Sequence, residues 1–119
     1  MISVLIDTNF LIYSFDKKND LRRIFDESVT DSYALITLDK CIGELNRLKR
    51  KDVISWCKLV GIKILSSPPY GKTDFLLIEV AKKYGYYLLS SDRALLQQAK
   101  SKSIKTLSVG GRGIKFSTN

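Results

Sequence analysis

The stretch ISVLID, residues 2–7, is an apolar run rich in β-branched residues that ends at Asp7. A run of this kind predicts a strand that is buried on both faces of a parallel sheet. A carboxylate that closes such a strand is costly to bury unless a cation pairs with it. Asp7 is therefore the first residue that we expect to serve function rather than folding.

Outward from this stretch, short apolar runs alternate with amphipathic segments along the chain. The alternation predicts a three-layer α/β/α sandwich around a central, mostly parallel sheet. A length of 119 residues suits one domain, residues 1–119, and is too short for two. Further strands are expected at 33–38, 62–65, 86–89 and 104–109, with an edge strand at 114–116. Helices are expected at 8–13, 21–29, 40–51, 53–60, 74–84 and 93–101, with Asp20, Asp39, Asp52 and Thr73 as N-caps.

Three more acidic residues lie at positions where the sequence pattern predicts burial, which is unfavourable for an unpaired carboxylate. Asp92 follows the strand expected at 86–89, and ligands bind beyond the carboxyl ends of strands in open parallel sheets. Asp74 shares a helix face with Leu77, so its carboxylate is expected to point inwards. Glu44 is expected at the edge of an apolar stripe that includes Leu48. The other eight acidic residues are expected in turns, at caps or on polar helix faces.

Four converging carboxylates would repel one another, and a divalent cation would remove that repulsion. The chain has no histidine, which excludes Ser-His-Asp and Cys-His sites, and two cysteines alone make a poor zinc site. Oxygen ligands favour Mg²⁺ or Mn²⁺, which would activate a water for phosphodiester hydrolysis. We expect Asp7, Glu44, Asp74 and Asp92 to be the metal ligands and catalytic groups, one of them assisting as base.

The formal charge of +8 favours a polyanionic partner, because a basic surface around an acidic pocket would deliver a nucleic acid to the metal. We expect the substrate to be a nucleic acid, with Tyr70 able to stack on a base. The cations expected to contact it are Arg47, Lys49, Arg50, Lys51, Lys72 and Arg93.

No apolar stretch approaches the ~20 residues of a membrane span, and the N-terminus lacks a signal-peptide pattern. The two cysteines fall in separate helical segments and need not face each other. We therefore expect a reduced, cytoplasmic protein with no membrane partner.

Four blocks, in this order and spacing, resemble the PIN-domain ribonuclease family: VLIDTNFL (residues 4–11), CIGELNRL (41–48), TDFLL (73–77) and LLSSDRAL (88–95). The resemblance covers nearly the whole chain. It implies an α/β/α fold and Mg²⁺- or Mn²⁺-dependent endonuclease activity on RNA. We expect this RNA to be single-stranded and to contact the cations named above. Carried over by position, the same four acids would form the metal site, and Asn9 and Ser90 would be polar groups that support them. The resemblance also implies a homodimer.

Two departures bear on the type of PIN protein. Many members have Thr-Asn where this chain has Ser90-Ser91, and many toxin-type members have an acid where this chain has Ala94. The second departure argues against a typical VapC toxin. The chain is more similar to small archaeal proteins related to ribosome-assembly endonucleases, which act in rRNA processing or RNA turnover, partly through its ending IKTL (residues 104–107) and GGR (110–112). A VapC-like toxin with an antitoxin partner stays open, as does a PIN-fold module that binds RNA or protein without cutting. A receiver-like signalling domain would need a pair of adjacent acids after an early strand. This chain has only Asp7 there, between Ile6 and Thr8, which argues against that class.

Overall fold

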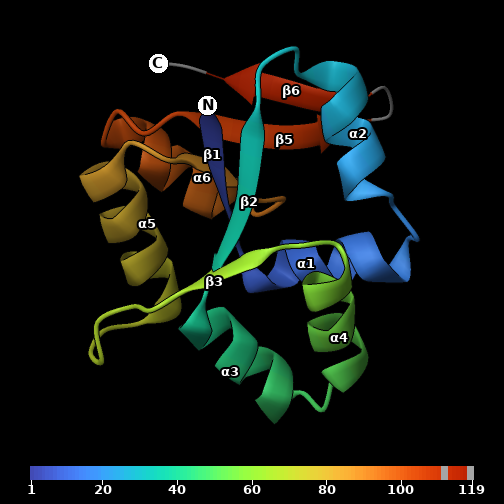
Figure 1. Cartoon of the computed structure of the whole chain (residues 1–119). Helices are drawn as coiled ribbons and strands as arrows, with labels where there is room; N and C mark the ends of the chain where they lie inside the picture. The colour runs from blue at the N-terminus through green and yellow to red at the C-terminus, as the bar shows by residue number, and fades with distance from the viewer. Residues whose placement is uncertain (111–112, 118–119) are drawn as a thin grey trace.

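A computed structural model describes residues 1–110 and 113–117, with side chains described for residues 1–109. The strands are β1 (Ile2–Ile6), β2 (Tyr33–Leu38), β3 (Lys63–Leu65), β4 (Tyr87–Leu89), β5 (Thr106–Gly110) and β6 (Gly113–Ser117). They form one sheet in the order β3-β2-β1-β4-β5-β6 (Figure 1). The first five strands are parallel, and β6 pairs antiparallel with β5. The predicted α/β fold with a mostly parallel sheet is confirmed.

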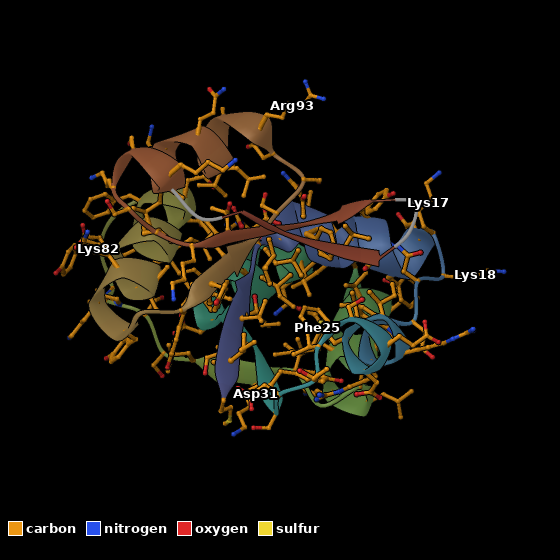
Figure 2. All side chains as sticks on the ribbon, turned by 90° about the horizontal axis from the view of Figure 1, so that it is seen from above. Lys17, Lys18, Phe25, Asp31, Lys82 and Arg93 are labelled. Atoms are coloured by element: carbon orange, nitrogen blue, oxygen red, sulfur yellow. The ribbon has the colours of Figure 1, made fainter. Side chains whose placement is uncertain are left out.

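Helices cover both faces of the sheet. They are α1 (Thr8–Asp16), α2 (Leu21–Ser28), α3 (Asp39–Arg47), α4 (Lys51–Leu59), α5 (Thr73–Tyr84) and α6 (Arg93–Ser101). Alternate residues of β1 join different apolar clusters, because neighbouring side chains of a strand point to opposite faces. Val4 and Ile6 pack in the cluster that contains Phe25 of α2, whereas Leu5 packs with α5 and α6. In Figure 2, Phe25 lies in the interior and Lys17 and Lys18 point outwards.

None of the helices in the described residues is long and apolar enough to cross a membrane.

The segment predicted as a single helix over residues 40–51 is interrupted. α3 ends at Arg47, Lys49 takes a left-handed φ of 59°, and α4 begins at Lys51. Leu48, which we placed in the apolar stripe of this helix, lies in the turn and is 57% exposed. A turn of three residues changes the helix direction here, and periodicity alone did not reveal it because no proline or glycine marks the break.

Three of the predicted caps are also wrong. Asp52 is the second residue of α4, whose N-cap is Arg50. Asp39 and Thr73 are the first residues of α3 and α5, and neither helix has a cap hydrogen bond from a described side chain. Asp39 instead accepts hydrogen bonds from the backbone N–H and the hydroxyl of Ser67, and so ties the start of α3 to the loop before α5. The cap at Asp20 is confirmed, since its carboxylate accepts from the Arg23 N–H at 3.1 Å.

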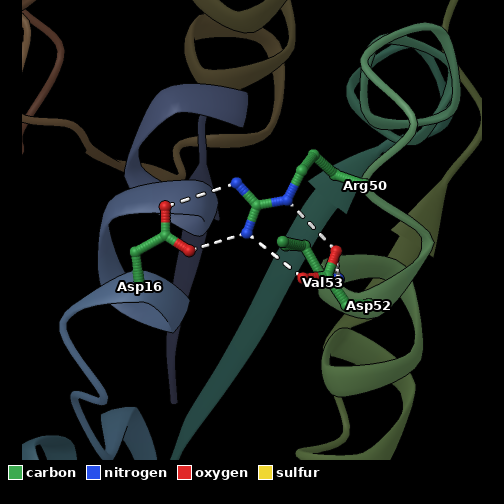
Figure 3. Close-up of polar contacts among 4 residues, drawn as sticks. All are labelled: Asp16, Arg50, Asp52 and Val53. Atoms are coloured by element: carbon green, nitrogen blue, oxygen red, sulfur yellow. Dashed lines mark hydrogen bonds and ion pairs between the residues drawn. The ribbon is translucent and has the colours of Figure 1, made fainter.

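Arg50 closes the turn between α3 and α4 by binding two carboxylates (Figure 3). One guanidinium nitrogen donates to Asp16 at 2.6 Å, and Nε donates to Asp52 at 3.1 Å. The guanidinium also lies over the Phe15 ring, 5.9 Å from its centroid. Because Asp16 belongs to α1 and Asp52 to α4, Arg50 holds α1, the turn and α4 together.

We expect Arg50→Gln to lower the unfolding midpoint clearly, whereas Arg23→Gln leaves it almost unchanged. The Arg50 side chain is only 27% exposed and binds two acids. The Arg23–Glu27 pair has side chains 75% and 65% exposed, and such pairs contribute little. Thermal melts of both variants measure the difference, and equal midpoints would contradict the proposed tie.

Candidate functional site

Asp7 sits at the junction between the end of β1 and the start of α1, and it is 4% exposed. One carboxylate oxygen accepts from the Phe10 N–H at 2.9 Å, which is the N-cap bond of α1. The other accepts from the Ser90 hydroxyl at 2.6 Å. A strand that leads directly into a helix thus places this carboxylate at the carboxyl edge of the sheet and fixes both of its oxygens.

Ser90 connects Asp7 to Asp92. Its hydroxyl donates to Asp7 and accepts from the Asp92 N–H at 3.0 Å. The Asp92 carboxylate caps α6, because one oxygen accepts from the Ala94 and Leu95 N–H groups at 3.0 and 3.3 Å. Asp92 is therefore a helix cap as well as a candidate site residue, and one of its oxygens is already engaged.

Glu44 and Asp74 approach the same edge from α3 and α5. Glu44 is half-buried and accepts from the Thr8 hydroxyl at 2.5 Å. Asp74 is exposed, so the prediction that its side chain lies in the buried stripe is wrong. The buried residues of α5 begin at Leu76, since the first turn of the helix extends beyond the packed core.

Three of the four acids line one cavity of about 220 Å³. Asp7, Glu44 and Asp74 contribute to its wall together with Asn9 and Thr8. A second, larger cavity of about 680 Å³ shares Glu44 and Asp74 and continues between α3 and the loop before α5. Asp92 is not among the residues that line either cavity.

Electrostatic coupling nevertheless joins all four acids. Burial raises the pKa of Asp7 to about 6, against the hydrogen bonds from Ser90 and Phe10, and the charges of Asp74 and Asp92 raise it further. Partial desolvation also raises the pKa of Asp74, although the residue as a whole is exposed, and the nearby charges of Asp92 and Glu44 add to this shift. Neighbouring negative charges therefore disfavour the ionised forms of Asp7 and Asp74, and a bound cation would relieve this repulsion.

The donor set suits a hydrated divalent ion better than a tightly chelated one. Among residues 1–109, no three His, Cys, Asp or Glu side chains lie close enough together to hold one ion. Mg²⁺ commonly binds one or two carboxylates and keeps several of its waters. The oxygen-only acids around the smaller cavity fit such an ion.

Cations border the acids on one side. Arg47 lines both cavities, and Lys72 lines the larger one. Lys49, Lys51 and Arg93 are exposed outside them. Arg50 differs from the other cations predicted to contact RNA, since two carboxylates occupy its guanidinium.

Sequence reasoning missed two residues of this site. Lys40 lines the larger cavity and donates to the Gly71 carbonyl at 2.9 Å. Thr8 is buried and orients Glu44. Both could have been found, because Thr8 follows the end of β1 by two residues and Lys40 follows the end of β2 by two residues.

Comparisons with solved structures identify the fold. The structure of the PIN domain endonuclease Utp24 superposes with a TM-score of 0.85 at 20% identity, covering 98% of this chain and 92% of that one. A PilT N-terminus domain protein from the hyperthermophilic archaeon Sulfolobus solfataricus P2 gives a TM-score of 0.61 at 14% identity, over 90% and 87% of the two chains. A domain of a functionally unknown protein from Methanocaldococcus jannaschii gives 0.63 at 17%, over 93% of each.

No protein-family model matches the sequence, and no curated protein matches it. The PIN-domain fold of the chain is shown by its structural likeness to Utp24, at low sequence identity.

We expect the pH dependence of stability to differ between wild type and Asp7→Asn in EDTA. The folded pKa of Asp7, about 6, lies above the ordinary aspartate value of 3.8, so the folded state binds the proton more tightly. The contribution of Asp7 to stability is then fully present below pH 3.8 and is lost as the pH rises to about 6. Asparagine can keep the Phe10 bond and has no charge to bury.

Urea unfolding at several pH values from 4 to 7 measures this. Relative to the variant, wild type should lose roughly 2–3 kcal/mol of unfolding free energy across the range. Parallel profiles for the two proteins would show that Asp7 ionises without a burial cost.

Proposed function

We propose that the protein is a divalent-metal-dependent endoribonuclease that hydrolyses phosphodiester bonds in RNA. The observation that supports this most is the meeting of Asp7, Glu44 and Asp74 in one cavity at the carboxyl edge of the sheet. This is the edge where open parallel sheets bind ligands. The likeness to the PIN domain endonuclease Utp24 is consistent with the same class of activity.

Asp7, Glu44 and Asp74 are the residues that would surround the ion, one or two of them directly and the rest through its waters, with the charge of Asp92 nearby. A bound divalent ion supplies an activated water and neutralises charge that develops on the phosphate. Ser90 holds the Asp7 carboxylate in place, and Thr8 holds that of Glu44. These two hydroxyls fix the acids before substrate arrives, so little reorganisation is needed during the reaction.

Arg47 and Lys72 would bind the phosphates on either side of the cut bond, because both line the cavity next to the acids. Neither side chain has a hydrogen-bond or ion-pair partner among the described residues. Lys40 braces the loop that carries Lys72 through its bond to Gly71. Both cations are thus available to a polyanion at this position.

A PIN-fold module that binds RNA without cutting is the alternative. It is favoured by one observation: in the described residues no three acids are close enough to share an ion. Cleavage assays separate the two functions. An antitoxin, a homodimer and a role in rRNA processing stay predictions. So does a cytoplasmic location, which the two buried, unbridged cysteines favour.

Wild-type protein should cleave single-stranded RNA in Mg²⁺ or Mn²⁺ and lose all cleavage in EDTA. Asp7→Asn should lower the rate by more than about 100-fold, since even the loss of a residue that orients a metal ligand costs about 10–100-fold. Glu79→Gln is the matched control, because Glu79 is an exposed carboxylate of α5 outside both cavities. Labelled RNA incubated with each protein and each metal measures the rates.

Identical fragments from wild type and Asp7→Asn would mean that the cleavage comes from a contaminant. RNA binding without any metal-dependent cleavage would support the non-cleaving module.

Ser90→Ala should lower the cleavage rate by about 10–100-fold and raise the Mg²⁺ concentration needed for half-maximal activity. The Ser90 hydroxyl is buried and holds Asp7, whereas neighbouring Ser91 is exposed and serves as the control in Ser91→Ala. A rate loss with an unchanged Mg²⁺ requirement would indicate a purely structural role for Ser90.

A further inference from the structure

The positive charge of the chain is unevenly distributed. Residues 81–119 contain eight Lys or Arg residues and one acidic residue, a net charge of +7, whereas residues 1–80 contain twelve basic and eleven acidic residues, a net charge of +1. Three of the four candidate site acids belong to residues 1–80. The excess charge therefore needs an explanation other than the delivery of substrate to those acids.

Four of these lysines gather at the end of the sheet opposite the acids. Lys82 and Lys83 lie in the last turn of α5, Lys102 follows α6, and Lys105 immediately precedes β5. Lys83 is nine residues beyond Asp74 in α5, which corresponds to ~14 Å along the helix axis. Because the strands are parallel, the start of β5 marks the amino edge of the sheet, away from Asp7.

The four lysines form a preorganised surface with two tyrosines. Lys82 Nζ donates to the Lys102 carbonyl at 2.6 Å, which joins α5 to the segment after α6. The Tyr84 and Tyr86 rings stack, with centroids 5.4 Å apart and planes inclined by 24°. Tyr84 is 52% exposed, and the Lys83 ammonium lies over its ring, 5.4 Å from the centroid. A base that stacks on Tyr84 would displace this ammonium from the ring, and the ammonium could then contact the phosphate of the same nucleotide. We call Lys82, Lys83, Tyr84, Tyr86, Lys102 and Lys105 the lysine–tyrosine surface.

A cavity of about 230 Å³ lies within this surface, and Lys82, Tyr86 and Lys105 contribute to its wall. Among the residues with described side chains, none that lines it is acidic. All four lysines are exposed, and in the part of the chain with described side chains none of them forms an ion pair with a carboxylate. Lysines in the last turn of a helix also stabilise the helix dipole, but Lys102 and Lys105 lie outside helices.

We propose that the lysine–tyrosine surface is a second RNA-binding site, which anchors the single strand at a distance from the acids. Lysines beside an exposed aromatic side chain match the chemistry of unpaired RNA, whose phosphates contact the ammonium groups while a base stacks on a ring. An acidic peptide would use the lysines and leave the ring stack without a role. The proposal rests on the proposed function only for the identity of the ligand.

The test compares Lys83→Gln/Lys102→Gln with a control that removes the same charge, Lys17→Gln/Lys18→Gln. Both control lysines are exposed and lie across the molecule from Lys82 (Figure 2). Fluorescence anisotropy in EDTA measures the affinity of the full chain for a long single-stranded RNA at several salt concentrations. The surface variant should bind more weakly than the control variant, and its salt slope should fall by up to about 1.4, since each phosphate contact on a single strand contributes about 0.7.

Tyr84→Leu should weaken binding of the long RNA about tenfold without changing the salt slope, because it removes a stacking face and no charge. Cleavage of a short oligonucleotide that spans only the acid site should be unchanged in every variant, with Mg²⁺ present. That second assay reads the proposed nuclease activity separately, so a protein that does not cleave can still support or contradict the anchor.

Equal affinities and slopes for the surface and control variants would overturn the proposal. If the surface variant lost binding only to poly-glutamate, the surface would instead fit an acidic protein. Weaker binding of the lysine variant combined with unchanged binding of Tyr84→Leu would also overturn it, since a purely electrostatic patch needs no ring stack.

Discussion

The carboxylate of Asp7 is almost excluded from water, and two hydrogen-bond donors offset the cost of burying it. One donor is the Phe10 N–H of α1, and the other is the hydroxyl of Ser90 in the segment between β4 and α6. The same hydroxyl accepts from the Asp92 N–H, so the starts of two helices and the ends of two neighbouring strands meet around one charge. The arrangement of the candidate site follows from satisfying this carboxylate.

That arrangement also explains why the acids lower the stability of the metal-free protein. Asp74 and Asp92 add repulsion to the burial of Asp7, and Glu44 adds repulsion to Asp74. A domain selected for stability alone would place a neutral side chain at such a position, since buried charges without cationic partners destabilise the fold. Residues that lower stability where ligands bind are a common cost of function.

The sequence predicted the strands well because their apolar runs are set by burial on both faces, and a buried run such as residues 2–6 admits few alternatives. It predicted the approach of Asp7 and Asp92, because both follow adjacent parallel strands. It failed where a side-chain contact decides the outcome. The turn at Lys49 depends on Arg50 reaching Asp16, 34 residues earlier, and the exposure of Asp74 depends on where the core ends along α5. Helical periodicity reports neither the contact between Arg50 and Asp16 nor the point at which the packed core ends along α5.

The separation of charge along the strand direction has a consequence for how a polyanion would meet this domain. An RNA strand approaching the acids at close range would be repelled by Asp7, Glu44 and Asp74 unless a cation is bound, whereas the lysines at the opposite edge would attract it whether or not that site holds a cation. Screening shortens the reach of exposed charges to about 8–10 Å in physiological salt, so the two ends of the molecule act almost independently. Binding and cleavage are therefore expected to respond to different ions: monovalent salt governs attraction at the lysine edge, and a divalent cation governs access to the acids.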